Sequence, residues 1–301
     1  MGMLIAFAAT WILLALRLPF LPRDHGRAFA VNGALSKGKV RGVGLILIII
    51  YVLVCLFTAP FSLHRSVELI LLALAMLAGY LDDASDRPWN EYLKGAIDLG
   101  ISVAATVNYM TQYGTRISIM SWELDLHPVI YLLLGTILVW MSINVTNCAD
   151  GVDGLCASLV IVSALSFMWV LPGLPADVSS DILLLVAVLG AYLCFNSSPS
   201  SMLMGDAGSR PLGLFLAVLA MRSGHPFIYL LLCAVLIVDG GLGLIKVSVI
   251  RFLGIKGFLT NIRTPIHDEL RSKRGWSDTQ VVARYMIIQC VIAACARFLV
   301  A

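Results

Sequence analysis

Charged residues are scarce in this sequence. Asp, Glu, Lys and Arg make up 13% of its 301 residues, whereas 59% are hydrophobic and the mean hydropathy is +0.92. An average soluble domain carries about 25% charged residues, so this composition excludes an ordinary soluble protein. We expect an integral membrane protein that forms one helical domain over residues 1–301, with membrane lipids and no nucleic acid among its partners.

Paired cysteines and internal repeats are also missing. The seven cysteines show no spacing typical of a metal site or a disulfide framework, and most stand within apolar runs. We therefore expect them to be small buried side chains. The first apolar run lacks a basic leader and is long enough to cross a bilayer, which argues against a cleavable signal peptide.

Apolar runs of spanning length are abundant. A membrane-spanning helix needs about 20 residues, and its backbone polar groups must pair within the segment. We therefore predict an all-α protein with about ten transmembrane helices, one of them kinked or broken at its glycines, within 226–250. The predicted spans are 2–21, 43–63, 67–81, 92–110, 128–146, 156–172, 181–195, 211–222, 226–250 and 281–300.

The distribution of Lys and Arg predicts the orientation. Cytoplasmic loops of membrane proteins are enriched in these residues. With both termini outside, the inner loops and adjoining helix ends hold 16 of the 21 basic residues, including Arg27 and Lys256. We expect a multi-pass protein of the bacterial inner membrane, with the polar motifs described below on its cytoplasmic face. The inner loops are 22–42, 82–91, 147–155, 196–210 and 251–280.

The first polar motif, YLDDASD, covers residues 80–86 at the inner end of a predicted span. It places Asp82 and Asp83 side by side. Adjacent carboxylates at a membrane boundary repel each other unless a cation joins them. A solvated helix end is the alternative interpretation of this motif.

The second motif, NVTNCADGVDGL, covers residues 144–155. Asn144 and Asn147 lie three apart at a helix end and so share one face. Two Asp-Gly steps, at Asp150 and Asp153, let the backbone turn tightly while both carboxylates aim at one point. Mg2+ prefers oxygen ligands and is usually held by one or two carboxylates together with substrate phosphates. The motif therefore favours a Mg2+-phosphate site over an ordinary polar turn.

The third motif, FNSSPSSMLMGDAGSRP, covers residues 195–211. Pro211 suits the first turn of the following helix. The two glycines let the backbone approach a bound group, and the amides at a helix N-terminus favour phosphate. Asp206 beside such a site requires a metal ion to offset its charge. A glycine turn that merely caps a helix is the alternative.

The remaining polar residues are more scattered. The motif TPIHDELRSKRGW, at 264–276, contains basic residues that fit the general inner-loop bias, and His267 is its best candidate for a specific role. Lys94 and Asp98 lie four apart and are expected either to pair or, in the case of Lys94, to reach a phosphate. Asp239 stands in the middle of a predicted span, where an ionisable residue is a functional candidate.

The order of these motifs resembles the polyprenyl-phosphate N-acetylhexosamine-1-phosphate transferases. Within that superfamily, the third and fourth motifs are most similar to the phospho-N-acetylmuramoyl-pentapeptide transferases, and the likeness runs from about Lys37 to Arg284. The resemblance implies a ten-helix fold, often a homodimer, and Mg2+ as cofactor. It also implies undecaprenyl phosphate as acceptor and UDP-N-acetylmuramoyl-pentapeptide as donor.

The resemblance also implies roles for individual residues. Asp82 and Asp83 match the aspartate pair on the lipid-phosphate side, and Asp206 matches the Mg2+ ligand. Asn196 matches an asparagine that binds uridine, and Lys94 a lysine that faces phosphate. The implied catalytic set is Asp82, Asp83, Asp150, Asp153, Asp206 and His267. The implied substrate-binding set is Lys37, Lys94, Asn144, Asn147, Gly151, Asn196 and Leu203.

The chain departs from the family pattern at three places. The family usually has three consecutive histidines after Pro-Ile, whereas here only His267 is kept and Asp268 and Glu269 follow it. The glycine-rich segment KGTPTMGG reads KGKVRGVG from Lys37 onward, and Leu203 stands where an aromatic residue is expected to stack on uracil. These departures concern nucleotide binding and the specificity for the sugar.

The reaction expected from these residues is attack of a lipid-phosphate oxygen on the sugar-side phosphorus of a UDP-sugar, with loss of UMP. Three alternatives stay open. The runner-up within the family is transfer of N-acetylglucosamine-1-phosphate. A transporter of anionic metabolites would explain Asp239, but transporters gather polar groups at the midplane rather than at one face. A non-catalytic membrane scaffold leaves the four motifs unexplained.

Overall fold

The computed structural model describes residues 1–26, 31, 33–58, 61–85, 87, 89–119, 122–255 and 257–300. Arg27, Asp86 and Lys256, which the sequence analysis placed on inner loops, lie outside these residues. The elements are α1 (Gly2–Ala15), η1 (Gly33–Ser36), α2 (Gly44–Thr58), α3 (Leu63–Asp83), α4 (Glu91–Tyr113), β1 (Arg116–Ile119), β2 (Trp122–Asp125), α5 (Pro128–Ala149), α6 (Leu155–Val170), α7 (Ala176–Asn196), α8 (Asp206–Arg222), η2 (Pro226–Ile228), α9 (Tyr229–Leu232), α10 (Ala234–Phe252), α11 (Ile266–Arg274) and α12 (Asp278–Val300).

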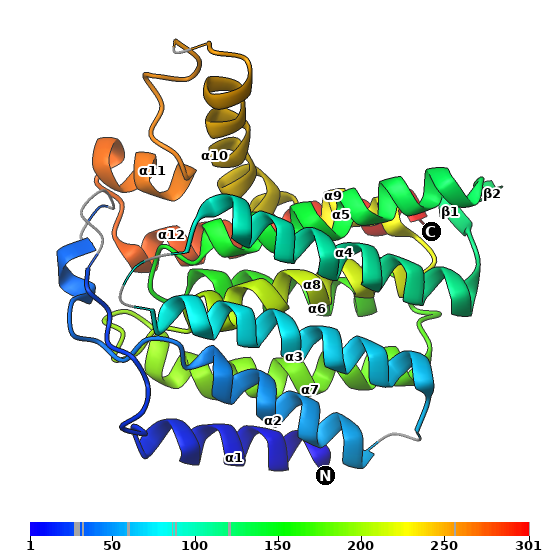
Figure 1. Cartoon of the computed structure of the whole chain (residues 1–301), viewed down its shortest axis with the longest axis horizontal. Coiled ribbons are helices and arrows are strands. Elements are labelled where there is room, and N and C mark those ends of the chain that lie inside the picture. The colour runs from blue at the N-terminus through cyan, green and yellow to red at the C-terminus, as the bar shows by residue number, and fades with distance from the viewer. Residues whose placement is uncertain are drawn as a thin grey trace.

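The long helices form one bundle in which α10 stands apart. In Figure 1, α1 to α8 and α12 run nearly parallel, and both chain termini lie at the end of the bundle that carries the β1–β2 hairpin. Helix α8 is at the centre, packed against α2, α3, α5 and α6, and every residue from 207 to 217 is buried. The polar loops and α11 gather at the opposite end (Figure 1).

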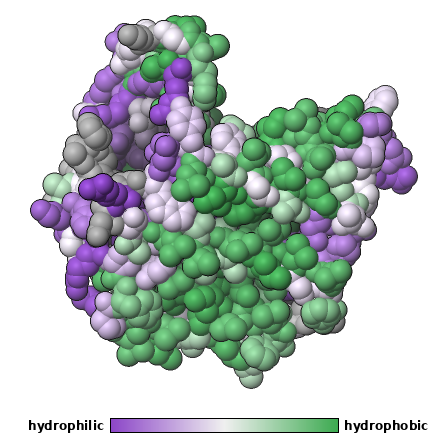
Figure 2. All heavy atoms as spheres, viewed as in Figure 1, coloured by the Kyte–Doolittle hydropathy of each residue, from purple (hydrophilic) through white to green (hydrophobic). Residues whose placement is uncertain are grey.

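The surface of the bundle is apolar. Figure 2 shows a broad hydrophobic face over the helices, with hydrophilic residues gathered at the two ends. Many large apolar side chains point outward, for example Leu133 and Ile137 of α5, which are 61% and 49% exposed. Exposed apolar area of this extent is not found on soluble monomers, and it matches a bundle that meets lipid. The protein is a multi-pass membrane protein.

The helical class is confirmed, whereas the number of ten spans and the sides of the termini stay predictions. Each predicted span overlaps a helix. Within the described residues, α5, α7 and α12 are long and apolar enough to cross a bilayer individually, and the bent pair 226–232 and 234–252 passes together. Helices α1, α2 and α6 are apolar but shorter.

Several local predictions were wrong. The first helix ends at Ala15, not at 21, and α8 begins at Asp206, more than a turn before Pro211. The hairpin and α11 were not predicted. The cysteines are not all buried, because Cys194, Cys290 and Cys295 are exposed. These three lie on α7 and α12, in helices that are themselves apolar.

The predicted break in the ninth span is confirmed, but its position is not at the glycines. The segments 226–232 and 234–252 meet at an angle of 88°, with the break at Cys233. Gly240 instead allows close contact with α5, because a Cβ there would lie 2.3 Å from the carbonyl oxygen of Val145. Glycine is therefore needed for helix packing at this point.

A cluster of buried ion pairs joins the helices at the end that carries the termini. Arg65 of α3 contacts Asp181 of α7 at 2.5 Å, and Arg222 of α8 contacts Asp181 at 2.9 Å and Glu68 at 3.3 Å. These side chains are 13% exposed or less. Charges buried this far from solvent are retained only when they are paired. The cluster therefore ties α3, α7 and α8 together at one end of the bundle.

Glycines hold α2 and α3 against α8 at the other end. A Cβ at Gly44 of α2 would lie 2.1 Å from the amide nitrogen of Gly208, and one at Gly79 of α3 would lie 2.3 Å from the carbonyl oxygen of Asp206. Real Cβ atoms do not approach this closely, so only glycine fits at these two positions. The first turn of α8 thus lies directly against the backbones of α2 and α3.

We expect Gly79→Ala to destabilise the protein, because the added methyl group must push α3 away from α8. Overpacking of this kind costs about 1–3 kcal/mol, and the midpoint of thermal unfolding in detergent should fall accordingly. Gly100→Ala on α4 is the matched control, since nothing lies within 4 Å of a Cβ there. An equal fall for both variants would contradict the packing argument.

Candidate active site

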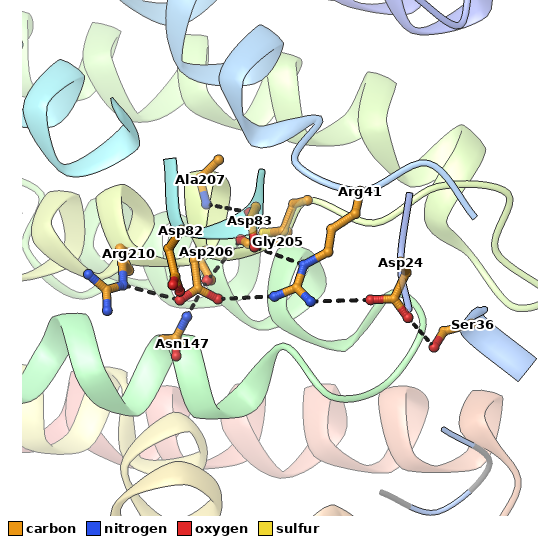
Figure 3. A network of polar contacts seen from close by, with 12 residues as sticks. Asp24, Ser36, Arg41, Asp82, Asp83, Asn147, Gly205, Asp206, Ala207 and Arg210 are labelled. Atoms are coloured by element: carbon orange, nitrogen blue, oxygen red, sulfur yellow. Dashed lines mark hydrogen bonds and ion pairs between the residues drawn. The ribbon is translucent and has the colours of Figure 1, made fainter. Parts of the chain in front are cut away.

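Four segments far apart in the sequence meet at the polar end of the bundle. They are the chain before α2, the end of α3, the end of α5 and the start of α8 (Figure 3). The structure therefore brings together the first three motifs of the sequence analysis. Hydrogen bonds and ion pairs connect them in one network.

Arg41 is at the centre of this network (Figure 3). Its guanidinium contacts Asp24 at 3.2 Å, Asp83 at 2.8 Å and Asp206 at 3.5 Å. Burial opposes the charged form of Arg41, but the carboxylates of Asp83, Asp206 and Asp24 outweigh it and raise the pKa of Arg41. A permanently charged fork thus joins the first and third motifs.

Asp206 is the first residue of α8 and contacts two arginines. Besides Arg41, its carboxylate lies 3.4 Å from Nε of Arg210, which also contacts the buried Asp98 at 3.2 Å. Asn147 of α5 hydrogen-bonds Asp206 and donates to the hydroxyl of Ser209 at 2.9 Å. A carboxylate at a helix N-terminus is stabilised by the free amides there. Asp206 is thus held by charges and by the start of its own helix.

The two adjacent aspartates of α3 have different partners. Asp83 accepts a hydrogen bond from the amide of Ala207 at 3.2 Å, next to Asp206. Asp82 accepts from the amide of Trp89 at 2.8 Å and forms an ion pair with Lys94 at 2.5 Å. Of the two alternatives for Lys94, pairing with Asp98 is wrong, because Lys94 contacts Asp82. Contact of Lys94 with a phosphate stays a prediction.

The Asp-Gly loop between α5 and α6 carries two carboxylates, Asp150 and Asp153. Asp150 follows the last turn of α5. Asp153 accepts hydrogen bonds from the amide and the hydroxyl of Ser200, both at 2.8 Å, and lies 3.5 Å from Lys39. Asp153 therefore ties this loop to the segment between α7 and α8. That both carboxylates aim at one point stays a prediction.

Asn196 holds the end of the same loop through hydrogen bonds of its side chain. Its side chain accepts from the amide of Gly154 and donates to the carbonyl of Met202, each at 2.9 Å, and it is 3% exposed. Gly154 has φ of 80°, a conformation that glycine adopts without strain. Both polar ends of the Asn196 amide are thus used within the chain. Its implied contact with uridine stays a prediction.

His267 lies at the start of α11 and meets two other parts of the site. Its Nδ1 lies 2.7 Å from the carboxylate of Asp239 on α10. A Cβ at Gly151 would lie 2.4 Å from Nε2 of His267, so the imidazole lies directly against the Asp-Gly loop. Asp268, which stands in place of a family histidine, pairs with Arg271 at 3.3 Å.

Two open cavities share Asp150 as a lining residue. One, of about 1070 Å³, is bordered by Lys39, Gly151, Asp153, Asn196, Leu203 and Arg271. The other, of about 1780 Å³, is bordered by Arg41, Lys94, Asn144, Asn147, Asp206 and Arg210, with apolar walls from α4 and α10. Asp150 borders both. Of the predicted substrate-binding residues, the exposed Lys37 borders neither cavity.

The sequence analysis missed several residues of the network. Arg41 and Lys39 stand in the segment that departs from the family pattern. Ser200 lies within the third motif but was not singled out there, and Asp24 belongs to no motif. Asp24 accepts from the Ser36 hydroxyl at 2.5 Å and thereby fixes the chain before α2. The signal for Arg41 and Lys39 was their place in a glycine-rich segment. Asp24 gave no such signal.

The ligand chemistry fits a magnesium ion completed by substrate. Among the described residues, no group of three or more His, Cys, Asp or Glu side chains is placed to hold a metal ion. Mg2+, however, is usually held by only one or two carboxylates together with substrate phosphates. Asp206, with the Asn147 amide beside it, borders a cavity large enough for such phosphates.

The fold and the site define a membrane-embedded transferase, and comparison with known proteins specifies its kind. Residues 66–224 match the family Glycosyl transferase family 4. This match covers α3 to α8, including the first three motifs. The chain belongs to this family and is a phospho-sugar transferase.

Its relatives narrow the class further. The chain is 38% identical over 294 residues to the phospho-N-acetylmuramoyl-pentapeptide-transferases of two strains of Treponema pallidum, covering 90% of this chain and 80% of each relative. It is 28% identical over 211 residues to the enzyme of that name from Dictyoglomus thermophilum, covering 70% of this chain and 65% of the relative.

We expect Asn196→Ala to destabilise the site more than it weakens ligand contacts. The substitution leaves the amide of Gly154 and the carbonyl of Met202 without partners, at about 1–3 kcal/mol for each buried group. The midpoint of thermal unfolding in detergent should fall clearly. Ser197→Ala, on the exposed neighbour, should leave it unchanged. Loss of nucleotide affinity at an unchanged midpoint would show that Asn196 contacts the ligand instead.

Proposed function

We propose that this enzyme transfers phospho-N-acetylmuramoyl-pentapeptide from UDP-N-acetylmuramoyl-pentapeptide to undecaprenyl phosphate, in a Mg2+-dependent reaction at the cytoplasmic face of the bacterial inner membrane. The observation that carries the proposal is a pair of cavities that share Asp150 as a lining residue, both with charged groups, of which the second also has apolar side chains from α4 and α10. Two chemically different substrates need two such approaches to one reacting centre. The names of the relatives supply the substrate classes.

The first cavity suits the nucleotide donor. Lys39 and Arg271 border it, each paired with an aspartate of the same lining, and Gly151 lets a ligand approach the backbone. Leu203 offers an apolar contact in place of an aromatic ring. Phosphate groups of the donor would then lie toward Asp150, where the second cavity begins.

The second cavity suits the lipid acceptor. Lys94 of α4, Arg210 of α8 and Arg41 of the chain before α2 border it. Leu244, Val247 and Phe252 of α10 form an apolar wall. An almost entirely apolar cavity of about 930 Å³ lies further along α5, bordered by Met141, Val145 and Ile237. A phosphate held at the cationic end with a prenyl chain along α5 fits this sequence of environments.

The reaction forms one bond and breaks one. An oxygen of the lipid phosphate attacks the sugar-side phosphorus of the donor, the bond to the bridging oxygen breaks, and UMP leaves with that oxygen. A phosphate monoester has its second pKa near 6, so the acceptor is largely dianionic at neutral pH. Asp82 or Asp83 accepts any remaining proton. Lys94 and Arg41 stabilise charge on the phosphates, and this positioning and electrostatic work carries most of the catalysis.

Mg2+ is proposed as the cofactor, with Asp206 as its protein ligand. When bound, it would neutralise the pyrophosphate and stabilise charge on the leaving phosphate. Asp206 now contacts Arg41 and Arg210 at 3.4–3.5 Å, longer than the 2.8 Å contact of Asp83 with Arg41. These longer contacts leave the carboxylate oxygens of Asp206 able to coordinate Mg2+. A homodimer, which the family resemblance implies, is part of the proposal.

The substrates are tested by comparing two donors. Purified protein in detergent with Mg2+ is given radiolabelled UDP-N-acetylmuramoyl-pentapeptide or UDP-N-acetylglucosamine, with and without undecaprenyl phosphate. We expect UMP and labelled lipid from the first donor, and only when the lipid is added. Lipid product from UDP-N-acetylglucosamine alone would favour the runner-up. Donor uptake into vesicles without UMP release would favour a transporter.

We expect Asp206→Asn to lower kcat by about 100-fold or more, because it removes the charge that would hold Mg2+ while keeping the shape of the side chain. Removal of the metal by EDTA should abolish wild-type transfer, and added Mg2+ should restore it. Asp125→Asn in the exposed hairpin is the matched control and should transfer normally. Near wild-type turnover of Asp206→Asn would exclude Asp206 as the ligand.

A further inference from the structure

Asp239 and Asp98 are the two most deeply buried carboxylates among the described residues, and the proposed reaction uses neither. Asp239 lies on α10, in the first turns after the 88° bend, and is 1% exposed. Its Oδ1 accepts from the backbone amide of His267 at 2.7 Å and from the Tyr285 hydroxyl at 3.2 Å, and its Oδ2 lies 2.7 Å from His267 Nδ1. One carboxylate thus joins α10, α11 and α12.

These contacts fix which ring nitrogen of His267 carries a proton. The two donors both reach Oδ1, and in an ionised Asp239 the second oxygen, Oδ2, is an acceptor as well, so Nδ1 of His267 donates to it. In the neutral ring, the proton is then on Nδ1 and the free lone pair is on Nε2. The same carboxylate also fixes the backbone of His267, so the ring cannot turn away without breaking a second hydrogen bond.

Nε2 of His267 points at the site rather than into the bundle. It faces Gly151, where a Cβ would lie 2.4 Å away, and Gly151 borders the nucleotide-side cavity. The nearest charged group on its own helix is Asp268, at 3.9 Å. A lone pair or a donated proton at Nε2 is therefore presented to the loop that holds Asp150.

We propose that Asp239 is a positioning residue that orients His267 and fixes its tautomer, and thereby sets the conformation of the Asp150–Gly151 turn at which the two cavities meet. This inference rests on the proposed function for its kinetic effect, but not for its structural content. Buried carboxylate–histidine pairs have this effect elsewhere, since the carboxylate selects the tautomer and holds the ring. Here the pair also links helix α10, which follows the 88° bend, to the reacting centre.

The test uses Asp239→Asn in the full-length protein. An amide offers one oxygen in place of two, so it cannot accept from both the Nδ1 proton and the backbone amide of His267. We expect kcat to fall by about 10–100-fold, as when other orienting partners of a functional histidine are removed. The KM for the donor should change by less than about threefold, because the nucleotide-side cavity keeps its own contacts.

Tyr285→Phe is the matched control. It removes a hydrogen bond from the same Asp239 oxygen but leaves both contacts with His267. We expect its kcat to stay within about twofold of wild type. A loss as large as that of Asp239→Asn would overturn the proposal, because any disturbance of this buried cluster would then be equivalent. The unfolding midpoint of both variants, measured in detergent, identifies a variant that has failed to fold.

A double-mutant cycle separates positioning from an independent role. If Asp239 acts through His267, adding Asp239→Asn to His267→Ala should lower kcat by no more than about twofold further. Multiplication of the two losses would overturn the proposal.

A spectroscopic arm does not depend on activity. The chain has five histidines, and 15N-histidine NMR of wild type, with His267 assigned by its loss in His267→Ala, should show the Nδ1-protonated tautomer. Asp239→Asn should change that signal, and Tyr285→Phe should not. An Nε2-protonated ring in the wild type would overturn the proposal. If the wild type transfers no phospho-sugar, the proposed function fails, and these spectra alone decide the inference.

Discussion

The contact of the first turn of α8 with the backbones of α2 and α3 is what the rest of the active site depends on. Gly44 and Gly79 allow that contact, and as a result Asp206 lies next to the end of α3, where Asp82 and Asp83 stand. Side chains on separate helices keep a fixed geometry only when the helices cannot slide. Here backbone meets backbone, and no flexible side chain lies between them to absorb movement.

Electrostatics follows from this packing. Asp83 and Asp206 are brought close by the helices, and their repulsion is offset by Arg41 from a segment that is otherwise loop. Asp24 and Ser36 in turn hold the segment that carries Arg41. The ion pairs at the other end of α3, α7 and α8 have no such link to substrate chemistry. Helices α3 and α8 are thus fixed at both ends, by close packing at one and by paired charges at the other.

Much of the fold and of the candidate site could be predicted from the sequence, because apolar runs and acidic motifs are both local signals. The helical class, the family and the grouping of Asp82, Asp83 and Asp206 followed from them. The start of α8 was misplaced because Pro211 suggests a first turn, whereas the helix accommodates it one turn further in. The roles of Arg41 and of Asn196 depend on partners distant in sequence, which no local pattern contains. The bend at Cys233 was misplaced to the glycines for the same reason, since the need for Gly240 comes from α5.

The right angle between α9 and α10 bears on how quickly the enzyme can find its lipid. Because α10 lies across the direction of the bundle (Figure 1), it extends sideways along the plane in which lipids move, and its apolar residues face the second cavity. Under the proposed function, the acceptor would arrive by two-dimensional diffusion within one leaflet, and the nucleotide by three-dimensional diffusion from water. The two paths are nearly perpendicular and end at one residue, Asp150.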